Sequence, residues 1–202
     1  MLNTNDIYKK ADEEFIETEK SSELIFDGKV LHLYRDEIYL PNGKESFREY
    51  CRHIGAVCVV PVTDEGEIIC VRQYRYAVGR TVLEIPAGKL DSRDEIPIDA
   101  AVRELREETG AAAQKITYMG EYFSSPAILD ERIYMFLAEG LEFGETDFDE
   151  DEFIEIVKIP VDELVGMIMR GEIIDGKTQA AVMRAALAIN KELQYTAQAE
   201  RN

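Results

Sequence analysis

Residues 84–111 read EIPAGKLDSRDEIPIDAAVRELREETGA and combine a Pro-Ala-Gly turn with a strongly acidic helical pattern. The second half of this stretch, rich in alanine, leucine and glutamate, predicts a helix of about four turns. Pro97 is tolerated near the start of that helix, because the first turn has no use for its missing N–H. Gly110 is expected to end the helix in a left-handed conformation.

Three glutamates share one face of this predicted helix. Glu104, Glu107 and Glu108 stand at positions i, i+3 and i+4, which places their Cβ atoms ~5–6 Å apart. Two such carboxylates at about 4 Å repel by between ~1 and ~4 kcal/mol, depending on the effective dielectric. A divalent cation removes the repulsion, and hard oxygen ligands suit Mg²⁺ or Mn²⁺. The alternative interpretation is a solvated acidic face on a surface helix.

The residues around these glutamates resemble the Nudix box. That pattern is Gly, five residues, Glu, seven residues, then Arg-Glu-aliphatic-x-Glu-Glu-x-Gly-aliphatic, and residues 103–111 match its second part completely. Glu95 lies seven residues before Arg103, as the pattern requires, but six residues separate it from Gly88. Asp94 therefore holds the position counted strictly from Gly88. We take Glu95 as the match, because helical phase is less forgiving than loop length.

Composition and charge limit the possible functions. A chain of 202 residues with 46% apolar residues can form one large domain, or one domain with a small appendage. The net charge of −18 argues against nucleic-acid binding through a basic surface. The N-terminal stretch MLNTNDIYKKADEEF is acidic and polar, so we do not expect it to act as a signal peptide, and no apolar run is long enough to span a membrane. Cys51, Cys58 and Cys70 lie in strand-like contexts without a CxxC motif, which favours reduced thiols and a cytoplasmic protein.

The order of the predicted elements suggests three regions. Residues 1–53 contain three short antiparallel strands and form an N-terminal appendage. Residues 54–195 form the Nudix hydrolase domain, and residues 196–202 are a frayed tail. Long apolar runs after Gly55 predict central strands covered by helices on both faces. The fold class is therefore α/β (α+β), an α/β/α sandwich with a mixed sheet, as the Nudix resemblance implies.

The later elements are assigned from periodicity and turn residues. Val161–Arg170 is predicted to be a helix with Asp162 near its N-cap, and a longer helix follows at Lys177–Leu193. The acidic, glycine-interrupted loop Gly140–Asp151 is expected to be mobile. The predicted strands are Lys115–Tyr122, Ile133–Glu139 and Glu152–Lys158.

Stretches outside the box resemble the ADP-ribose pyrophosphatase subfamily. They include Pro126, which lies sixteen residues past Gly110, and the segments 52–57, 72–76, 150–155 and 171–178. The resemblance implies Mg²⁺-dependent hydrolysis of ADP-ribose to AMP and ribose 5-phosphate. It also implies a homodimer in which the N-terminal sheets are exchanged, with a nucleotide sugar as substrate and neither nucleic acid nor membrane as partner.

Two other functions stay open. One is a hydrolase of GDP-mannose or another nucleotide sugar, because few residues touch the base. The other is a catalytically inactive nucleotide-binding Nudix module, which predicts that box glutamates are missing. All of them are present in this sequence.

The resemblance also assigns roles to individual residues. The expected metal ligands are Glu104, Glu107, Glu108 and the carbonyl of Ala87. Arg103 is expected to buttress these glutamates, and Glu95 either orients the loop or binds metal. A loop carboxylate is expected to deprotonate the attacking water, because such a group can swing in once substrate is bound. The candidates for this carboxylate, at the end of the acidic loop that precedes the strand at 152–158, are Glu152 and, in reserve, Glu150.

Five residues are expected to contact the substrate. Arg75 would hold a phosphate or stack on adenine, since a guanidinium does either better than lysine. Glu84 is expected to present a carboxylate to the substrate or the metal. The full set is Arg52, Arg75, Glu84, Gly88 and Pro126.

Overall fold

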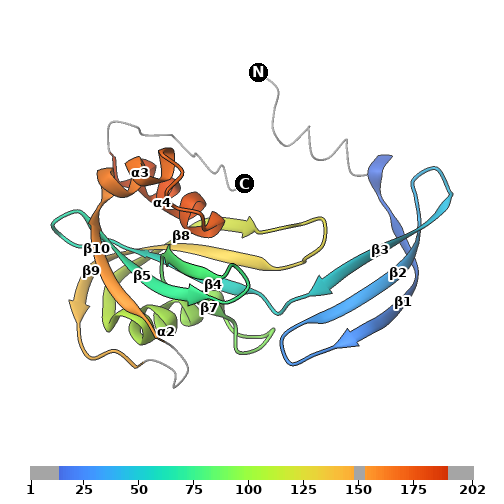
Figure 1. Cartoon of the computed structure of the whole chain (residues 1–202), viewed down its shortest axis with the longest axis horizontal. Helices are drawn as coiled ribbons and strands as arrows, with labels where there is room; N and C mark the ends of the chain where they lie inside the picture. Colours follow the sequence, from blue (N-terminus) through green and yellow to red (C-terminus); the bar gives the residue numbers. More distant parts are fainter. Residues whose placement is uncertain (1–13, 148–152, 191–202) are drawn as a thin grey trace, which may run out of the picture. The chain divides into compact units, whose positions relative to one another are not determined.

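The computed structural model describes residues 14–147 and 153–190, and these fall into two compact units (Figure 1). Of the described residues, the N-terminal unit comprises residues 14–53 together with Ser125–Glu131. The second unit comprises residues 54–124, 132–147 and 153–190. The sequence analysis did not anticipate that residues 125–131 belong with the N-terminal unit. The predicted tail 196–202 lies outside the described residues.

The N-terminal unit is built on a three-stranded antiparallel sheet, as predicted. Its strands are β1 (Thr18–Asp27), β2 (His32–Tyr39) and β3 (Glu45–Arg52), in the order β1-β2-β3. The loop 125–131 attaches to β3, because Cys51 N–H donates to the Ile128 carbonyl at 2.9 Å. Every residue of β1 is exposed within the single chain.

The strands of the second unit form two sheets rather than the one mixed sheet expected. In the four-stranded sheet, β4 (Ala56–Pro61) and β9 (Arg132–Phe143) run parallel to each other and their outer neighbours run antiparallel to them, so this sheet is mixed. The other sheet is antiparallel throughout. The four-stranded sheet has the order β7 (Ala87–Lys89), β4, β9, β8 (Ala111–Phe123), and the three-stranded sheet has the order β10 (Glu155–Pro160), β5 (Glu67–Arg75), β6 (Arg80–Glu84).

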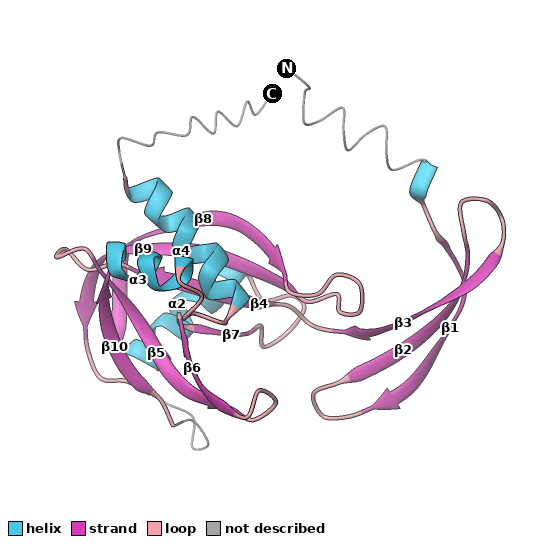
Figure 2. Ribbon diagram, turned by 45° about the horizontal axis from the view of Figure 1, so that its top comes forward, coloured by secondary structure: helices cyan, strands magenta, loops and turns pink. Residues whose placement is uncertain are grey.

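The helices lie on both faces of the four-stranded sheet, which confirms the sandwich (Figure 2). They are α2 (Pro97–Thr109), α3 (Val161–Met169) and α4 (Gly176–Ile189). Strand β4 is buried along its whole length, because successive side chains face opposite helices. Val57 and Val59 belong to the core with α2, whereas Cys58 and Val60 belong to the core with α4. None of the helices among the described residues is long and apolar enough to cross a membrane.

The ends of the helices follow local sequence signals. Gly110 ends α2 with φ of 68°, a left-handed conformation that costs glycine little, and its N–H donates to the Arg106 carbonyl. Helix α4 begins at Asp175, whose carboxylate accepts the Thr178 N–H. Helix α3 has Pro160 as its N-cap, and Asp162 lies in its first turn, near the cap as predicted.

Candidate active site

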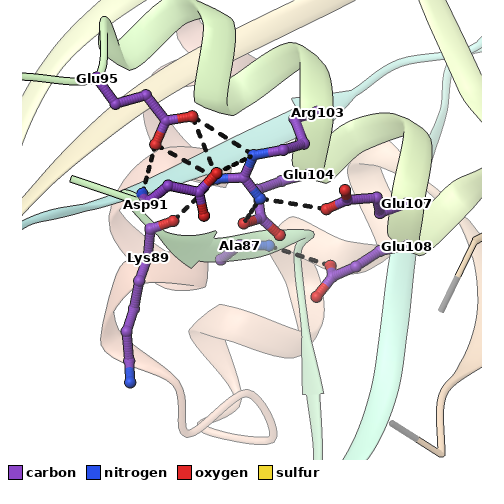
Figure 3. A network of polar contacts seen from close by, with 8 residues as sticks. All are labelled: Ala87, Lys89, Asp91, Glu95, Arg103, Glu104, Glu107 and Glu108. Carbon is purple, nitrogen blue, oxygen red and sulfur yellow. Dashed lines mark hydrogen bonds and ion pairs between the residues drawn. The ribbon is translucent and has the colours of Figure 1, made fainter. Parts of the chain in front are cut away.

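Arg103 lies at the centre of a group of carboxylates on α2 and the preceding loop (Figure 3). Its Nη1 donates to Glu104 at 2.7 Å and to Glu107 at 3.2 Å. Its other nitrogens lie 3.4 Å from Glu95 and 3.5 Å from Asp91. Burial opposes its charge, but the hydrogen bond and charge of Glu104 outweigh that and raise the Arg103 pKa. One guanidinium thus holds four carboxylates, the arrangement expected of a buttressing residue.

Glu95 also shapes the loop before the helix. Its carboxylate accepts the backbone N–H of Asp91 at 2.6 Å and faces Arg103 on the other side. Asp94, by contrast, is exposed. The structure therefore places Glu95 against Arg103, and its contacts fit the loop-orienting role better than the metal-binding role.

Glu104 and Glu108 are buried beneath the short strand β7. The Ala87 N–H donates to Glu108 at 3.1 Å, so the box helix holds the backbone that carries the predicted carbonyl ligand. A Cβ on Gly88 would overlap the carboxylate of Glu104, which means that only glycine allows this approach. Glu107 is more open, with 37% of its side chain exposed.

The donor atoms of this group suit a hard divalent cation, since all of them are carboxylate or carbonyl oxygens. The buried Glu104 and the more open Glu107 share one arginine, so both carboxylates also gain from an added positive charge. Within residues 14–147 and 153–190, however, no three His, Cys, Asp or Glu side chains are already arranged to hold a metal ion. These residues therefore match a divalent cation in the type of their donor atoms. In the structure, the side chain of Arg103 lies between Glu104 and Glu107.

A second charged cluster lies at the end of β6. Glu84, 2% exposed, accepts two hydrogen bonds from Arg75, from Nε at 2.7 Å and from Nη2 at 2.8 Å. Lys177 at the start of α4 donates to the same carboxylate and lies 3.2 Å from Asp175. The carboxylate of Glu84, expected to face substrate or metal, is thus engaged by two cations of the chain itself.

The charges in this second cluster stabilise one another. Burial opposes ionisation of Glu84, but the hydrogen bond from Arg75 and the charge of Lys177 lower its pKa. Burial likewise opposes the charge on Lys177, and the Asp175 and Glu84 carboxylates raise its pKa. The pKa of Arg75 is raised mainly by its hydrogen bond to Glu84, with a contribution from the charge of Glu108. Arg75 therefore lies within electrostatic reach of the box helix.

The segment between the two clusters is held from three directions. Ile85 N–H donates to the Thr178 hydroxyl at 3.0 Å, and Val59 N–H donates to the Pro86 carbonyl at 2.9 Å. Ala87 is held by Glu108, as described above. Helix α4, strand β4 and helix α2 therefore fix residues 85–87, the loop that carries the predicted backbone ligand.

Two of the predicted substrate residues belong to the N-terminal unit. Arg52 lies over the ring of Tyr34, with 3.9 Å between its Cζ and the ring centroid, and donates to the Tyr50 hydroxyl. Pro126 lines a cavity of about 540 Å³ in the same unit, together with Tyr50 and Asp36. The roles of both residues stay predictions. Glu150 and Glu152, the candidate bases, lie outside the described residues.

A profile described as the NUDIX domain matches residues 52–181, which is more than half of the chain. The chain belongs to the Nudix family. Nudix enzymes generally use a divalent metal, in accord with the oxygen donors on α2. A crystal structure titled ADP compounds hydrolase has the same fold, with a TM-score of 0.76 and 22% identity over 84% of this chain and 92% of that one.

Individual Nudix relatives are more similar in sequence. The ADP-ribose pyrophosphatase of Bacillus subtilis is 45% identical over 164 residues, covering 80% of this chain and 88% of that protein. A methanol dehydrogenase activator of Bacillus methanolicus is 41% identical, covering 83% and 91%. A GDP-mannose pyrophosphatase of Yersinia enterocolitica is 34% identical, covering 73% and 83%.

The sequence analysis of this Nudix chain missed three residues that complete the second cluster. Lys177, Asp175 and Thr178 lie in a segment that was noted only for its resemblance. The Asp-Gly-Lys-Thr order signals a helix N-cap, since Asp175 precedes Thr178 by three residues. It gives no sign that the lysine is buried against Glu84.

Proposed function

We propose that this protein hydrolyses the pyrophosphate bond of ADP-ribose to AMP and ribose 5-phosphate in a Mg²⁺-dependent reaction. The observation that carries the proposal is the 45% identity to the Bacillus subtilis ADP-ribose pyrophosphatase over most of both chains. The complete set of box glutamates supports catalysis over the inactive module. GDP-mannose hydrolysis ranks second, because the relative with that activity in its name is 34% identical.

The chemistry assigns a role to each group of residues. Water adds to one phosphorus of the diphosphate, the bridging P–O bond breaks, and the departing phosphate carries away the bond electrons. A divalent cation supplies charge neutralisation and a more acidic water when bound. Glu104, Glu107, Glu108 and the Ala87 carbonyl would hold it. Mg²⁺ is the expected ion and Mn²⁺ an acceptable substitute, because both prefer oxygen ligands.

The remaining residues bind the substrate and orient the attacking water. Arg75 donates to a phosphate or stacks on adenine, and Glu152, with Glu150 in reserve, accepts the proton of the attacking water. Glu152→Gln should slow turnover by roughly 100-fold and leave Mg²⁺ affinity almost unchanged. A large loss of Mg²⁺ affinity in that variant would make Glu152 a ligand instead of the base.

The direct test uses purified protein, Mg²⁺ and a panel of ADP-ribose, GDP-mannose and other nucleotide sugars. We expect the highest kcat/KM for ADP-ribose, with products AMP and ribose 5-phosphate, and no turnover after chelation of the metal. Fast turnover of GDP-mannose without turnover of ADP-ribose would refute ADP-ribose as the substrate, but the assignment as a nucleotide-sugar pyrophosphatase would stand. Absence of turnover for the whole panel would favour the inactive nucleotide-binding module.

We also propose a homodimer with exchanged N-terminal sheets. The three-stranded sheet leaves many large apolar side chains in water within a single chain, more than monomeric proteins usually do. Light scattering should give twice the mass of the 23.0 kDa chain, and a monomer at micromolar concentration would contradict this. The exposed side chains include Leu24, Ile25, Phe26, Val30, Leu31 and Phe47.

A cytosolic location accompanies this proposal. Cys51, Cys58 and Cys70 are all free thiols in the structure, as a reducing compartment would keep them. Burial raises the pKa of the Cys58 and Cys70 thiols to about 12, so neither is a nucleophile at neutral pH. Labelling of all three thiols in freshly unfolded protein, without prior reduction, would support the assignment.

A further inference from the structure

The start of α4 contacts both halves of the site without belonging to the box. Lys177 donates to Glu84, which in turn holds Arg75. One residue later, Thr178 accepts the N–H of Ile85, the first residue of the loop that leads to Ala87. Two consecutive side chains at the start of α4 therefore support both parts of the proposed site: Lys177 supports the proposed substrate-binding Arg75, and Thr178 supports the backbone before the proposed metal ligand Ala87.

We propose that Lys177 and Thr178 are positioning residues for the proposed reaction: Lys177 orients Arg75 through Glu84, and Thr178 holds the backbone that ends at Ala87. This inference rests on the proposed function and adds two residues to it. Neither side chain is assigned a role by the Nudix box, which ends at Ala111.

The first half of the inference follows from how Arg75 is held. Arg75 uses Nε and Nη2 on Glu84, while its Nη1 makes no hydrogen bond to any other described residue. Its side chain is 42% exposed, so an incoming anion can reach the guanidinium. A guanidinium fixed on one edge loses little further entropy when it binds a phosphate with the other.

Lys177 keeps that arrangement electrically balanced. Glu84 and Asp175 together carry two negative charges, and Arg75 and Lys177 carry two positive ones. Without Lys177, Arg75 would be the single cation facing two carboxylates, and the cluster would gain a net negative charge. The competing carboxylates and the added negative charge both weaken the attraction of Arg75 for a diphosphate. Removing Lys177 should therefore reduce substrate affinity more than it reduces the rate of the chemical step.

The second half of the inference follows from the burial of Thr178. Its side chain is fully buried, and its hydroxyl donates to Asp175 at 2.6 Å while accepting from Ile85. Valine at this position keeps the shape and removes both hydrogen bonds, which leaves the Ile85 N–H buried without an acceptor. The loop then loses one of its three supports, and the Ala87 carbonyl loses its fixed position.

The test of Lys177 compares Lys177→Met with Lys115→Met, which removes an exposed lysine that also pairs with a glutamate, Glu139. We expect Lys177→Met to raise KM for ADP-ribose about tenfold, with kcat changed by less than about threefold. Calorimetric binding of ADP-ribose in EDTA should weaken by the same factor. Lys115→Met should match wild type in both measurements.

A double-mutant cycle tests whether Lys177 acts through Glu84. In a Glu84→Gln background, the effect of Lys177→Met on ADP-ribose binding should fall below about twofold. Wild-type affinity in Lys177→Met, or full additivity in the cycle, would overturn the inference. Should Lys177→Met fail to fold, Lys177→Gln replaces it with the same expected loss of affinity, since its amide is neutral.

The test of Thr178 compares Thr178→Val with Thr117→Val, at an exposed position of β8. We expect Thr178→Val to weaken Mg²⁺ binding about tenfold by calorimetry, the size typical of groups that orient metal ligands. Thr178→Ser, which keeps the hydroxyl, should restore binding. The positioning role of Thr178 would be refuted by unchanged Mg²⁺ affinity in Thr178→Val, or by an equal loss of Mg²⁺ affinity in Thr178→Ser.

These measurements separate the inference from the proposed function. Wild-type protein that neither binds nor hydrolyses ADP-ribose defeats the proposed substrate, and Mg²⁺ binding by the Thr178 variants still decides the positioning role. Wild-type turnover of ADP-ribose combined with unaffected Lys177 and Thr178 variants defeats the inference and leaves the proposed function standing.

Discussion

The two charged clusters of the Nudix unit differ in how their charges are matched. Around Arg103, one guanidinium contacts the carboxylates of Glu95, Glu104 and Glu107 and lies near that of Asp91. Around Glu84, two cations meet two carboxylates. A cluster with surplus negative charge is completed by an added cation, whereas a balanced and buried cluster is complete by itself. The first is therefore suited to binding metal and the second to holding position.

The largest predicted loss concerns Glu108, which lies on the same helix as Glu104 and Glu107 and accepts the Ala87 N–H. Glu108→Gln should lower kcat by roughly 1,000-fold, equivalent to ~4 kcal/mol of transition-state stabilisation, because it removes a proposed metal ligand. The protein should still fold, since glutamine can accept the Ala87 N–H. Steady-state kinetics with Mg²⁺ measure the loss, and Glu139→Gln, on the exposed part of β9, serves as control. Near wild-type turnover in Glu108→Gln would count against the ligand assignment.

The next effect breaks the balanced cluster. Glu84→Gln should lower the free energy of unfolding by about 3 kcal/mol, because it leaves the largely buried Lys177 and the half-exposed Arg75 beside a neutral amide. Urea denaturation measures this, with the exposed Glu163→Gln, which also pairs with an arginine, as control. Equal stability of the two variants would show that the Glu84 cluster does not support the fold.

A smaller effect tests whether the carboxylates around Arg103 carry an excess of negative charge. Arg103→Met should lower the melting temperature by ~2–4 °C, the shift produced by about 1 kcal/mol in a protein of this size. Mg²⁺ should raise the melting temperature of this variant more than that of wild type, because the released carboxylates gain most from a cation. An identical Mg²⁺ response in the two proteins would contradict this explanation.

The smallest effect is a pH dependence specific to the balanced cluster. Glu84 has a pKa below its ordinary value of 4.5, so its stabilisation is present above that value and is lost as the pH falls through the folded pKa. Lys177 has a pKa above its ordinary value of 10.5, so its stabilisation is present below that value and is lost as the pH rises through the folded pKa. The stability difference between wild type and Lys177→Met should be flat between these limits and shrink outside them.

Much of the site follows from local sequence because helical spacing is a local property. The spacing of Glu104, Glu107 and Glu108 on α2 and the Gly110 cap depend on the backbone period alone, and the structure has both. The choice of Glu95 over Asp94 also agrees with the contact to Arg103. The three N-terminal strands followed from turn residues. Strand pairing beyond hairpins depends on distant segments, which is why the division into two sheets was missed.

The family, the carboxylate face of α2 and the sandwich of helices around apolar strands can all be predicted from the chain's periodicity and fixed spacings. In contrast, the folded structure is needed to see that Lys177, 93 positions after Glu84, shares the buried Glu84 carboxylate with Arg75, and that Thr178 supports the Ile85 backbone. Pairing between charges and between hydrogen-bonding groups distant in sequence is fixed by three-dimensional packing. No local pattern records which distant partner a lysine or threonine will meet.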